Sequence, residues 1–184
     1  VAVGWELVVV GVAAIAAGWF YTGGPRPYGY AGYGEVFVFV FFGVVATVGS
    51  TYVQLGRVTW ISALASLAVG AYATAILVVN NLRDIPGDTT SGKRTLAVRL
   101  GDQRTRLLYA ALMVVPYVVL PFLAGLSGRP LAALAFVGLL AGARPISIVL
   151  GGAKGIDLVP VLAATGRAQL VFGVLLSLGL VVIP

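Results

Sequence analysis

The chain has 184 residues, of which 60% are apolar and only 10% are charged, and its mean hydropathy is +1.04. Soluble domains average about 25% charged residues, so this composition excludes an ordinary water-soluble fold and predicts lipid as the main solvent. The net charge is +6, and there is neither cysteine nor histidine. Disulfides and thiolate metal sites are therefore excluded, and we expect any metal to be a hard cation bound by oxygen, such as Mg2+.

Six apolar runs have about the length that a helix needs to cross a bilayer, roughly 20 residues. They cover residues 7–21, 36–54, 60–79, 107–124, 131–150 and 168–183. The first is short unless it starts at residue 1, and Arg144-Pro145 is expected to interrupt the fifth near a membrane surface. Small residues recur in the runs and predict close helix packing. We expect an all-α polytopic membrane bundle of six transmembrane helices, forming a single domain over residues 1–184.

Basic residues gather in alternate connections between these runs. Ten of the twelve lie on one side of the predicted bundle, which is cytoplasmic by the positive-inside rule. We expect a multi-pass protein of the cell (plasma) membrane with the polar stretch 80–106 on the cytoplasmic side. The ten are Arg26, Arg83, Lys93, Arg94, Arg99, Arg104, Arg106, Arg144, Lys154 and Arg167.

The stretch 80–106 is expected to form a loop after the third helix and contains most of the charge. Asp84 and Asp88 are four residues apart, so on a helix they share a face and can hold one divalent cation or two bridged cations. Pro86 disfavours helical geometry at Ile85, so the helix is expected to end or kink between the two aspartates.

Neighbouring side chains add to this candidate cation site. Asn80 and Asn81 lie one turn upstream and can supply amide oxygens or hydrogen bonds. Mg2+ binds through one or two carboxylates plus substrate phosphates. Arg83, Lys93 and Arg94 can then make charge-assisted contacts with phosphate oxygens. A solvated loop that only sets topology is the alternative, but it explains the aspartates poorly, because ionisable residues at the edge of a membrane bundle tend to be functional.

The run NNLRDIPGDTTSGKRTLAVRLG, residues 80–101, resembles the second aspartate-rich motif of the UbiA-type intramembrane prenyltransferases. The segment YTGGPRPYGYAGYGE, residues 21–35, is similar to that family's loop between helices four and five. Shorter matches are FFG at 41–43, YVQ at 52–54 and DLVPVL at 157–162. Within the family, the resemblance is strongest to the branch that prenylates 1,4-dihydroxy-2-naphthoate in menaquinone biosynthesis.

The resemblance implies a larger protein than this chain. Family members have nine transmembrane helices and two aspartate-rich motifs that bind a prenyl diphosphate through Mg2+. The six predicted helices correspond to helices four to nine, and the first motif is expected to precede Val1. The chain opens on Val1 and its only methionine is Met113, which agrees with an absent N-terminal part. We expect this chain alone to be inactive and the full-length protein to be the enzyme.

The implied reaction transfers a polyprenyl group from polyprenyl diphosphate to 1,4-dihydroxy-2-naphthoate, with decarboxylation, and yields demethylmenaquinone. The partners implied are these two substrates and the lipid bilayer, and no nucleic acid is expected. By resemblance, the catalytic metal ligands are Asp84 and Asp88, with support from Asn80 or Asn81. The pyrophosphate contacts are Arg83, Lys93, Arg94 and Arg26.

Four further residues are candidates for binding the aromatic substrate. Glu35 is one, although an acid near a helix N-terminus is also favoured by the helix dipole. Tyr21 and Tyr28 flank Arg26 and are expected to line the cavity. Gln54 is the fourth, although hydrogen bonds between helices explain it equally well.

Other residues of these segments have structural interpretations. Tyr30 and Tyr33 are expected to belong to an interfacial aromatic belt. Gly92 and Gly101 are expected in turns, and Asp102 is expected to cap the next helix.

Several functions compete with prenyl transfer to the naphthoate. Other UbiA-type enzymes use homogentisate, 4-hydroxybenzoate, a chlorophyll precursor or phosphoribosyl pyrophosphate. A cation-binding half of a membrane transporter is the alternative from another class, but it should place ionisable groups near the middle of its helices. A subunit that only completes a partner's bundle is a third possibility, which the specific motif disfavours.

Overall fold

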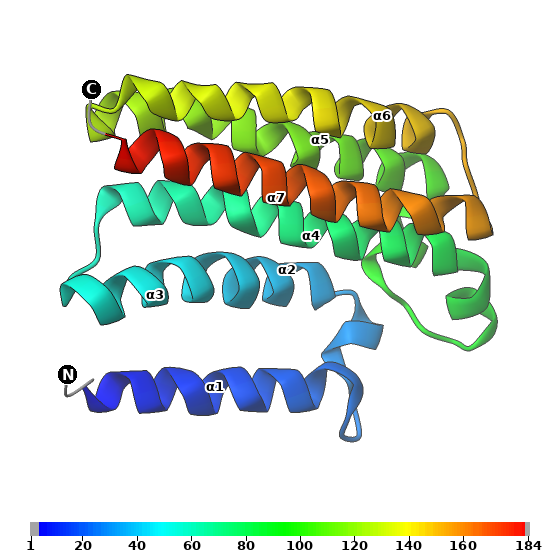
Figure 1. Ribbon diagram of the computed structural model, residues 1–184. Coiled ribbons are helices and arrows are strands. Elements are labelled where there is room, and N and C mark those ends of the chain that lie inside the picture. Colours follow the sequence, from blue (N-terminus) through cyan, green and yellow to red (C-terminus); the bar gives the residue numbers. More distant parts are fainter. Residues whose placement is uncertain (1–3, 183–184) are drawn as a thin grey trace.

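The computed structural model describes residues 4–182, and within them six helical spans are long and apolar enough to cross a membrane. They run back and forth between the two ends of one bundle (Figure 1). The predicted all-α class and number of spans are confirmed. The elements in chain order are α1 (Trp5–Thr22), η1 (Tyr28–Ala31), α2 (Gly34–Val38), η2 (Phe39–Val45), α3 (Ala46–Leu55), α4 (Trp60–Thr90), α5 (Leu96–Ser127), η3 (Pro130–Val137), α6 (Gly138–Leu150), η4 (Gly155–Leu158) and α7 (Val159–Val181).

The first two spans lie within two residues of their predicted limits. The first is α1, and the second consists of α2, the π-helical segment η2 and α3, which follow one another without a break. The last span begins at η4, well before its predicted start at residue 168, and its predicted end at residue 183 lies outside the described residues.

The third span corrects the prediction for the candidate site. Helix α4 does not end at residue 79 but continues through Pro86 to Thr90. Proline removes only one backbone donor from the helix, and the neighbouring turn is reinforced because the Thr89 hydroxyl donates to the Ile85 carbonyl at 2.7 Å. Most of the expected loop is therefore helical, and only residues 91–95 separate α4 from α5.

Helix α5 likewise begins earlier than predicted, at Leu96 rather than residue 107. It is kinked at Gly101, whose φ of 76° and ψ of 170° are open to glycine but strained for other residues. Asp102 follows the kink and was expected to cap a helix. In the described part of the chain its carboxylate binds the Arg106 guanidinium, at 2.7 and 2.8 Å, rather than a backbone amide.

The predicted interruption at Arg144-Pro145 is wrong. The fifth span begins with the 3-10 segment η3, and α6 then runs through Pro145 to Leu150. The end of α6 is bonded to α5, because the buried Arg106 guanidinium of α5 donates to the carbonyl oxygens of Val149 and Ala153. These two bonds join α5 to the end of α6 and to the connection that follows it.

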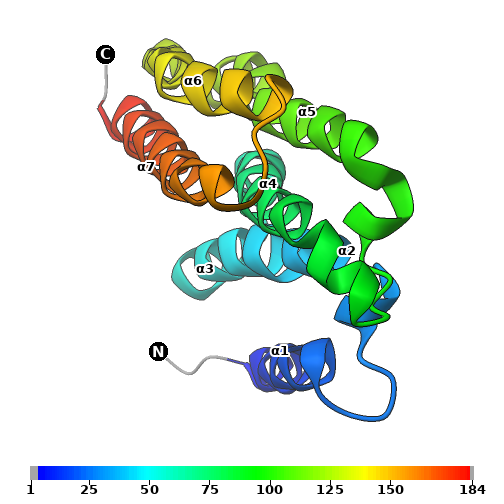
Figure 2. The same cartoon turned by 90° about the vertical axis from the view of Figure 1, so that its right-hand side faces the viewer.

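Helix α4 lies at the centre of the bundle, with α5, α7 and the α2–α3 span packed around it (Figure 2). Its small residues allow close approach, and the interior carries two polar pairs that satisfy each other: Tyr72 with Tyr117, and Tyr109 with Thr165, each at 2.7 Å. Helix α1 lies apart from this core, and none of its residues is buried.

The connections after α1, α4 and α6 lie at one end of the bundle (Figure 1). These are the connections that carry or adjoin most of the basic residues, so the fold gathers positive charge at that end. The same end contains the last turns of α4 and the short loop that follows it.

The contact between η2 and α4 gives a test of this packing. A methyl group added to Gly43 would overlap the Cα of Gly70, whereas one added to Gly49 would meet nothing within 4 Å. We expect Gly43→Ala to lower the free energy of unfolding by about 1–3 kcal/mol, because the backbones would have to separate. Gly49→Ala is the control and should leave stability equal or slightly higher, since alanine favours helix. Thermal unfolding in detergent measures both, and equal midpoints would contradict the close approach.

Candidate functional site

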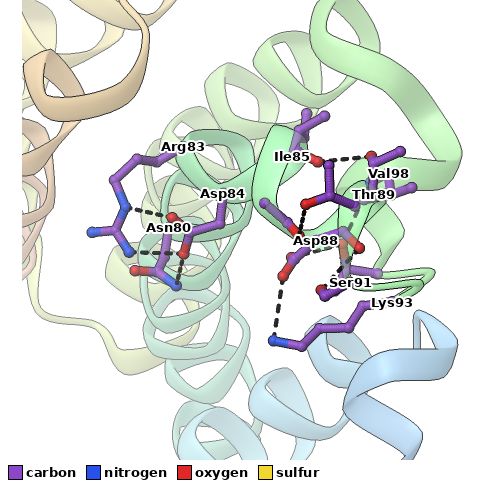
Figure 3. A network of polar contacts seen from close by, with 12 residues as sticks. Asn80, Arg83, Asp84, Ile85, Asp88, Thr89, Ser91, Lys93 and Val98 are labelled. Carbon is purple, nitrogen blue, oxygen red and sulfur yellow. Dashed lines mark hydrogen bonds and ion pairs between the residues drawn. The ribbon is translucent and has the colours of Figure 1, made fainter.

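The last three turns of α4 carry an acidic residue that is already paired with neighbouring polar groups. The carboxylate of Asp84 accepts two hydrogen bonds from the Arg83 guanidinium, at 2.7 and 2.8 Å. The amide of Asn80, one turn earlier, donates to Asp84 Oδ2 at 3.5 Å (Figure 3). Since Asp84 is only partly buried, its free lone pairs remain accessible to a ligand.

Asp88 lies one turn later and is buried, with 8% of its surface exposed. Its carboxylate lies 3.4 Å from the Lys93 ammonium and accepts a hydrogen bond from the Thr95 hydroxyl, also at 3.4 Å. The loop that follows α4 folds back over this carboxylate, because the Lys93 amide donates to the Asp88 carbonyl at 2.9 Å. Thr95 also caps α5 by accepting from the Val98 amide.

The two aspartates share one helix, which does not end between them as predicted, and their carboxylates contact different partners (Figure 3). In residues 4–182, no three acidic, histidine or cysteine side chains converge as a metal cluster. Two carboxylates and an amide are hard oxygen donors and suit Mg2+, which usually completes its shell with water and substrate phosphates. The donor set of this part of the chain thus fits a metal that is bound together with a phosphorylated ligand.

A third acid faces the same region from α2. Glu35 is 5% exposed and accepts a hydrogen bond from the Asn81 amide at 2.9 Å. The ring of Tyr21 lies against the adjacent Gly34, where an added Cβ would come within 3.2 Å of it. Tyr28 packs edge-on against Tyr21, with ring centroids 5.5 Å apart. The structure therefore brings together Glu35, Tyr21, Tyr28 and Asn81.

Apolar space begins beside the acidic residues and extends along the bundle. A cavity of about 610 Å³ is lined by Asn80 and Leu77 of α4, Phe42 of η2 and Gln169 of α7. Gln169 also lines a second cavity of about 1130 Å³, between α3, α4 and α7. The polar end of α4 thus adjoins an extended and mainly apolar space within the bundle.

Three predicted site residues lie outside the cluster at the end of α4. Gln54 lies near the end of α3, at the opposite end of the bundle, and its amide donates to the Ser50 carbonyl at 3.0 Å. Arg26 is exposed in the connection between α1 and η1. Arg94 is exposed as well, although its backbone amide donates to the Tyr30 carbonyl at 2.9 Å.

Sequence reasoning missed two residues that contact the site. Thr95 directly precedes the apolar start of α5, which is the signature of an N-cap and predicts its position but not its bond to Asp88. Tyr30 was expected to lie in an interfacial belt, yet its ring lies 4.8 Å from the Lys93 ammonium. That contact joins two segments far apart in the sequence, and no local pattern indicates it.

Comparison with known proteins identifies the family of this chain. A model of the UbiA prenyltransferase family matches residues 1–151. Proteins named 1,4-dihydroxy-2-naphthoate octaprenyltransferase are similar to the chain in three bacteria. The one from Mycobacterium tuberculosis is 48% identical over 166 residues, which cover 90% of this chain and 56% of the relative. For Mycobacterium leprae the identity is 46%, covering 91% and 56%, and for Bacillus subtilis 32%, covering 97% and 58%.

The chain spans about half the length of the curated relatives it matches. The family match covers most of the chain and includes α4, the loop 91–95 and the contacts of Asp84 and Asp88. The matched residues form a bundle of apolar helices with acidic, amide and basic side chains clustered at one end. The chain belongs to the UbiA prenyltransferase family.

Proposed function

We propose that this chain forms part of an enzyme that transfers a polyprenyl group from polyprenyl diphosphate to 1,4-dihydroxy-2-naphthoate, in a Mg2+-dependent reaction with loss of carbon dioxide. The observation that carries the proposal is the pair Asp84 and Asp88, set among cationic side chains at the end of α4 and beside an apolar cavity. The names of the similar proteins support the naphthoate as acceptor and an octaprenyl donor.

The cation would be held by Asp84 and Asp88, with Asn80 or Asn81 as further oxygen donors. When bound, Mg2+ supplies positive charge that stabilises the leaving diphosphate. Both aspartates are paired with a cation of the chain itself, Asp84 with Arg83 and Asp88 with Lys93. This pairing limits the cost of keeping unbound carboxylates at the edge of a membrane, because an unpaired and partly buried charge is strongly unfavourable.

The same two cations become available when a ligand arrives. With a divalent ion held by the two carboxylates, Arg83 and Lys93 would be free to bind the oxygens of the diphosphate. Arg94 and Arg26 are exposed at the same end of the bundle and complete the proposed pyrophosphate site from the surface. Without a ligand, each of the two carboxylates is balanced by the cation beside it.

The prenyl chain of the donor would occupy the apolar space that starts at Asn80 and Leu77. The second cavity, which shares Gln169, extends this space between α3, α4 and α7. An isoprenoid chain dissolved in the bilayer can enter this space without exposing apolar surface to water, because the lining is as apolar as lipid tails. The polar diphosphate then remains at the acidic and basic end.

The acceptor would lie near Glu35, Tyr21 and Tyr28. The buried Glu35 carboxylate can accept a hydrogen bond from a hydroxyl group of the naphthoate, while the tyrosine rings offer flat surfaces for its aromatic system. Gln54, at the other end of the bundle, is no longer part of the proposed acceptor site.

The chemical step requires the allylic carbon–oxygen bond of the donor to break, with its electron pair leaving on the diphosphate. The ring carbon that carries the carboxylate then forms a bond to the allylic carbon. Cleavage of the bond to the carboxylate returns its electrons to the ring and releases carbon dioxide. The residues of this chain contribute by orienting both substrates and by stabilising charge on the leaving group, which is the larger electrostatic task.

The placement of charge disfavours a cation transporter. Asp84 and Asp88 lie in the last two turns of a 31-residue helix, at its end rather than near its middle. A transporter site near the bilayer midplane would need ionisable groups at mid-helix positions. Other prenyl acceptors are distinguished by assay, since homogentisate and 4-hydroxybenzoate can be offered in place of the naphthoate.

Replacing one proposed metal ligand tests this function in the full-length protein. We expect Asp84→Asn to lower the turnover number by at least roughly 100-fold, because it removes charge that binds the cation without changing the side-chain shape. Thr90→Val in the last turn of the same helix, also nearly isosteric and at an exposed position, is the matched control and should retain activity. Product formation from octaprenyl diphosphate, Mg2+ and dihydroxynaphthoate, measured by mass spectrometry, reads out both. Full activity of Asp84→Asn would exclude Asp84 as a ligand.

The proposed cytoplasmic position of the site is tested by single cysteines, which the cysteine-free chain accommodates cleanly. Gln103→Cys lies at the end of the bundle that carries the site, and Val58→Cys lies at the other, and both positions are exposed. A membrane-impermeant maleimide added to intact cells should label Val58→Cys only, and permeabilisation should add Gln103→Cys. The reverse pattern would place the site outside the cell.

A further inference from the structure

The turn η1, between α1 and α2, contacts the loop that follows α4. Two interactions join them: the Tyr30 carbonyl accepts from the Arg94 amide at 2.9 Å, and the Tyr30 ring lies 4.8 Å from the Lys93 ammonium. The Arg99 guanidinium closes the loop by donating to the Arg94 carbonyl at 3.0 Å. The turn therefore lies directly against residues 93 and 94.

The turn is fixed on several sides before it meets the loop. The Tyr28 hydroxyl donates to the Ala17 carbonyl of α1 at 2.7 Å, and its ring stacks on Phe37 of the second span at 3.9 Å. Gly32 ends the turn with a φ of 84°, and an added Cβ there would meet the Arg94 carbonyl oxygen at 3.1 Å. These contacts hold the backbone on both sides of Tyr30.

Lys93 lies between this ring and the acidic site. Its ammonium is 3.4 Å from Asp88 Oδ1 on one side and faces the Tyr30 ring on the other. The side chain is 36% exposed, so contact with solvent is only partly excluded. An ammonium group over a tyrosine ring is attracted by the negative face of the π system. A flexible lysine, which otherwise samples many rotamers, is thus restricted to the edge of the site.

We infer that Tyr30 is a positioning residue, which holds the Lys93 ammonium at the edge of the site so that it can bind a diphosphate oxygen. This inference rests on the proposed function for the identity of the ligand. The contact between Tyr30 and Lys93 is independent of that function. When a cation neutralises Asp88, the ring keeps the ammonium within reach of the incoming phosphate group. The ring restricts the lysine in advance and lowers the entropic cost of binding.

A merely structural role for Tyr30 makes different predictions. If the ring only filled surface space, its removal would loosen the whole turn and affect distant residues as much as Lys93. If its hydroxyl were important, phenylalanine would not replace it. The backbone bond to Arg94 is kept in every variant, so changes at Lys93 report on the side chain of Tyr30.

Acylation of the two lysines tests the contact without any enzymatic reaction. Lys93 and Lys154 are the lysines of this chain, and Lys154 is exposed in the connection between α6 and η4, so it serves as an internal reference. We expect Tyr30→Leu to raise the rate of Lys93 acylation relative to Lys154 by about two- to fivefold. Tyr30→Phe should stay near the wild-type ratio, and so should Tyr33→Leu, whose exposed ring belongs to the same connection. An unchanged ratio in Tyr30→Leu, or an equal rise at both lysines, would overturn the inference.

Binding and kinetics of the full-length protein test the second half of the inference. Inorganic pyrophosphate with Mg2+ should protect Lys93 from acylation, and the protection should require about two- to fivefold more pyrophosphate in Tyr30→Leu. In turnover, Tyr30→Leu should raise KM for polyprenyl diphosphate by the same factor with little change in kcat. A fall in kcat at constant KM would overturn positioning. If wild-type protein transfers no prenyl group, the proposed function fails, whereas the ligand-free acylation ratio still decides the Tyr30–Lys93 contact.

Discussion

The inability of lipid to solvate charge is the constraint on which the rest of this structure depends. Backbone groups in a bilayer must find partners within the chain, and helices satisfy that need segment by segment. Side-chain charge must lie at the helix ends or be paired, since an isolated charge in the hydrocarbon is expensive. The fold obeys both requirements: the polar interior groups bond to each other, as Tyr72 does to Tyr117, and the acidic pair lies in the last two turns of α4.

The same constraint explains how much of the fold follows from the sequence. Hydropathy alone predicts six spans, and the periodic placement of basic residues predicts which connections share an end. The limits of α4 and α5 could not be predicted in this way, because residues 80–90 and 96–106 are polar yet helical. Their helicity comes from local hydrogen bonds and from tertiary contacts, such as those of Arg106 with the α6–η4 connection, which hydropathy does not contain. Pro86 and Pro145 were interpreted as breaks although each costs a helix a single donor.

The candidate site, like the fold, could be predicted from the sequence only in part. Spacing and residue type identified Asp84, Asp88, Asn80 and Lys93, since these are neighbours along the chain. The bond between Glu35 and Asn81 and the ring of Tyr30 over Lys93 depend on how separate helices are placed, and no spacing rule encodes them. Gln54 was predicted to bind the aromatic substrate because it is a polar residue in an apolar segment. Its amide instead donates to the Ser50 carbonyl of the same helix, at the end of the bundle opposite the site.

Arg106 has a mechanical consequence for the protein. Its guanidinium links Asp102 of α5 to the carbonyls of Val149 and Ala153, so it acts as a tie between the kinked start of α5 and the end of α6. Helices α5 and α6 are thereby joined at the end of the bundle that carries the site. Helix α1 buries no residue of its own, and it is joined to its neighbours by two other bonds: the Tyr52 hydroxyl of α3 donates to Glu6, and the Tyr28 hydroxyl donates to the Ala17 carbonyl. Displacing either α5 or α6 at the end that carries the site would break the buried contacts of Arg106, so the two helices are expected to move together.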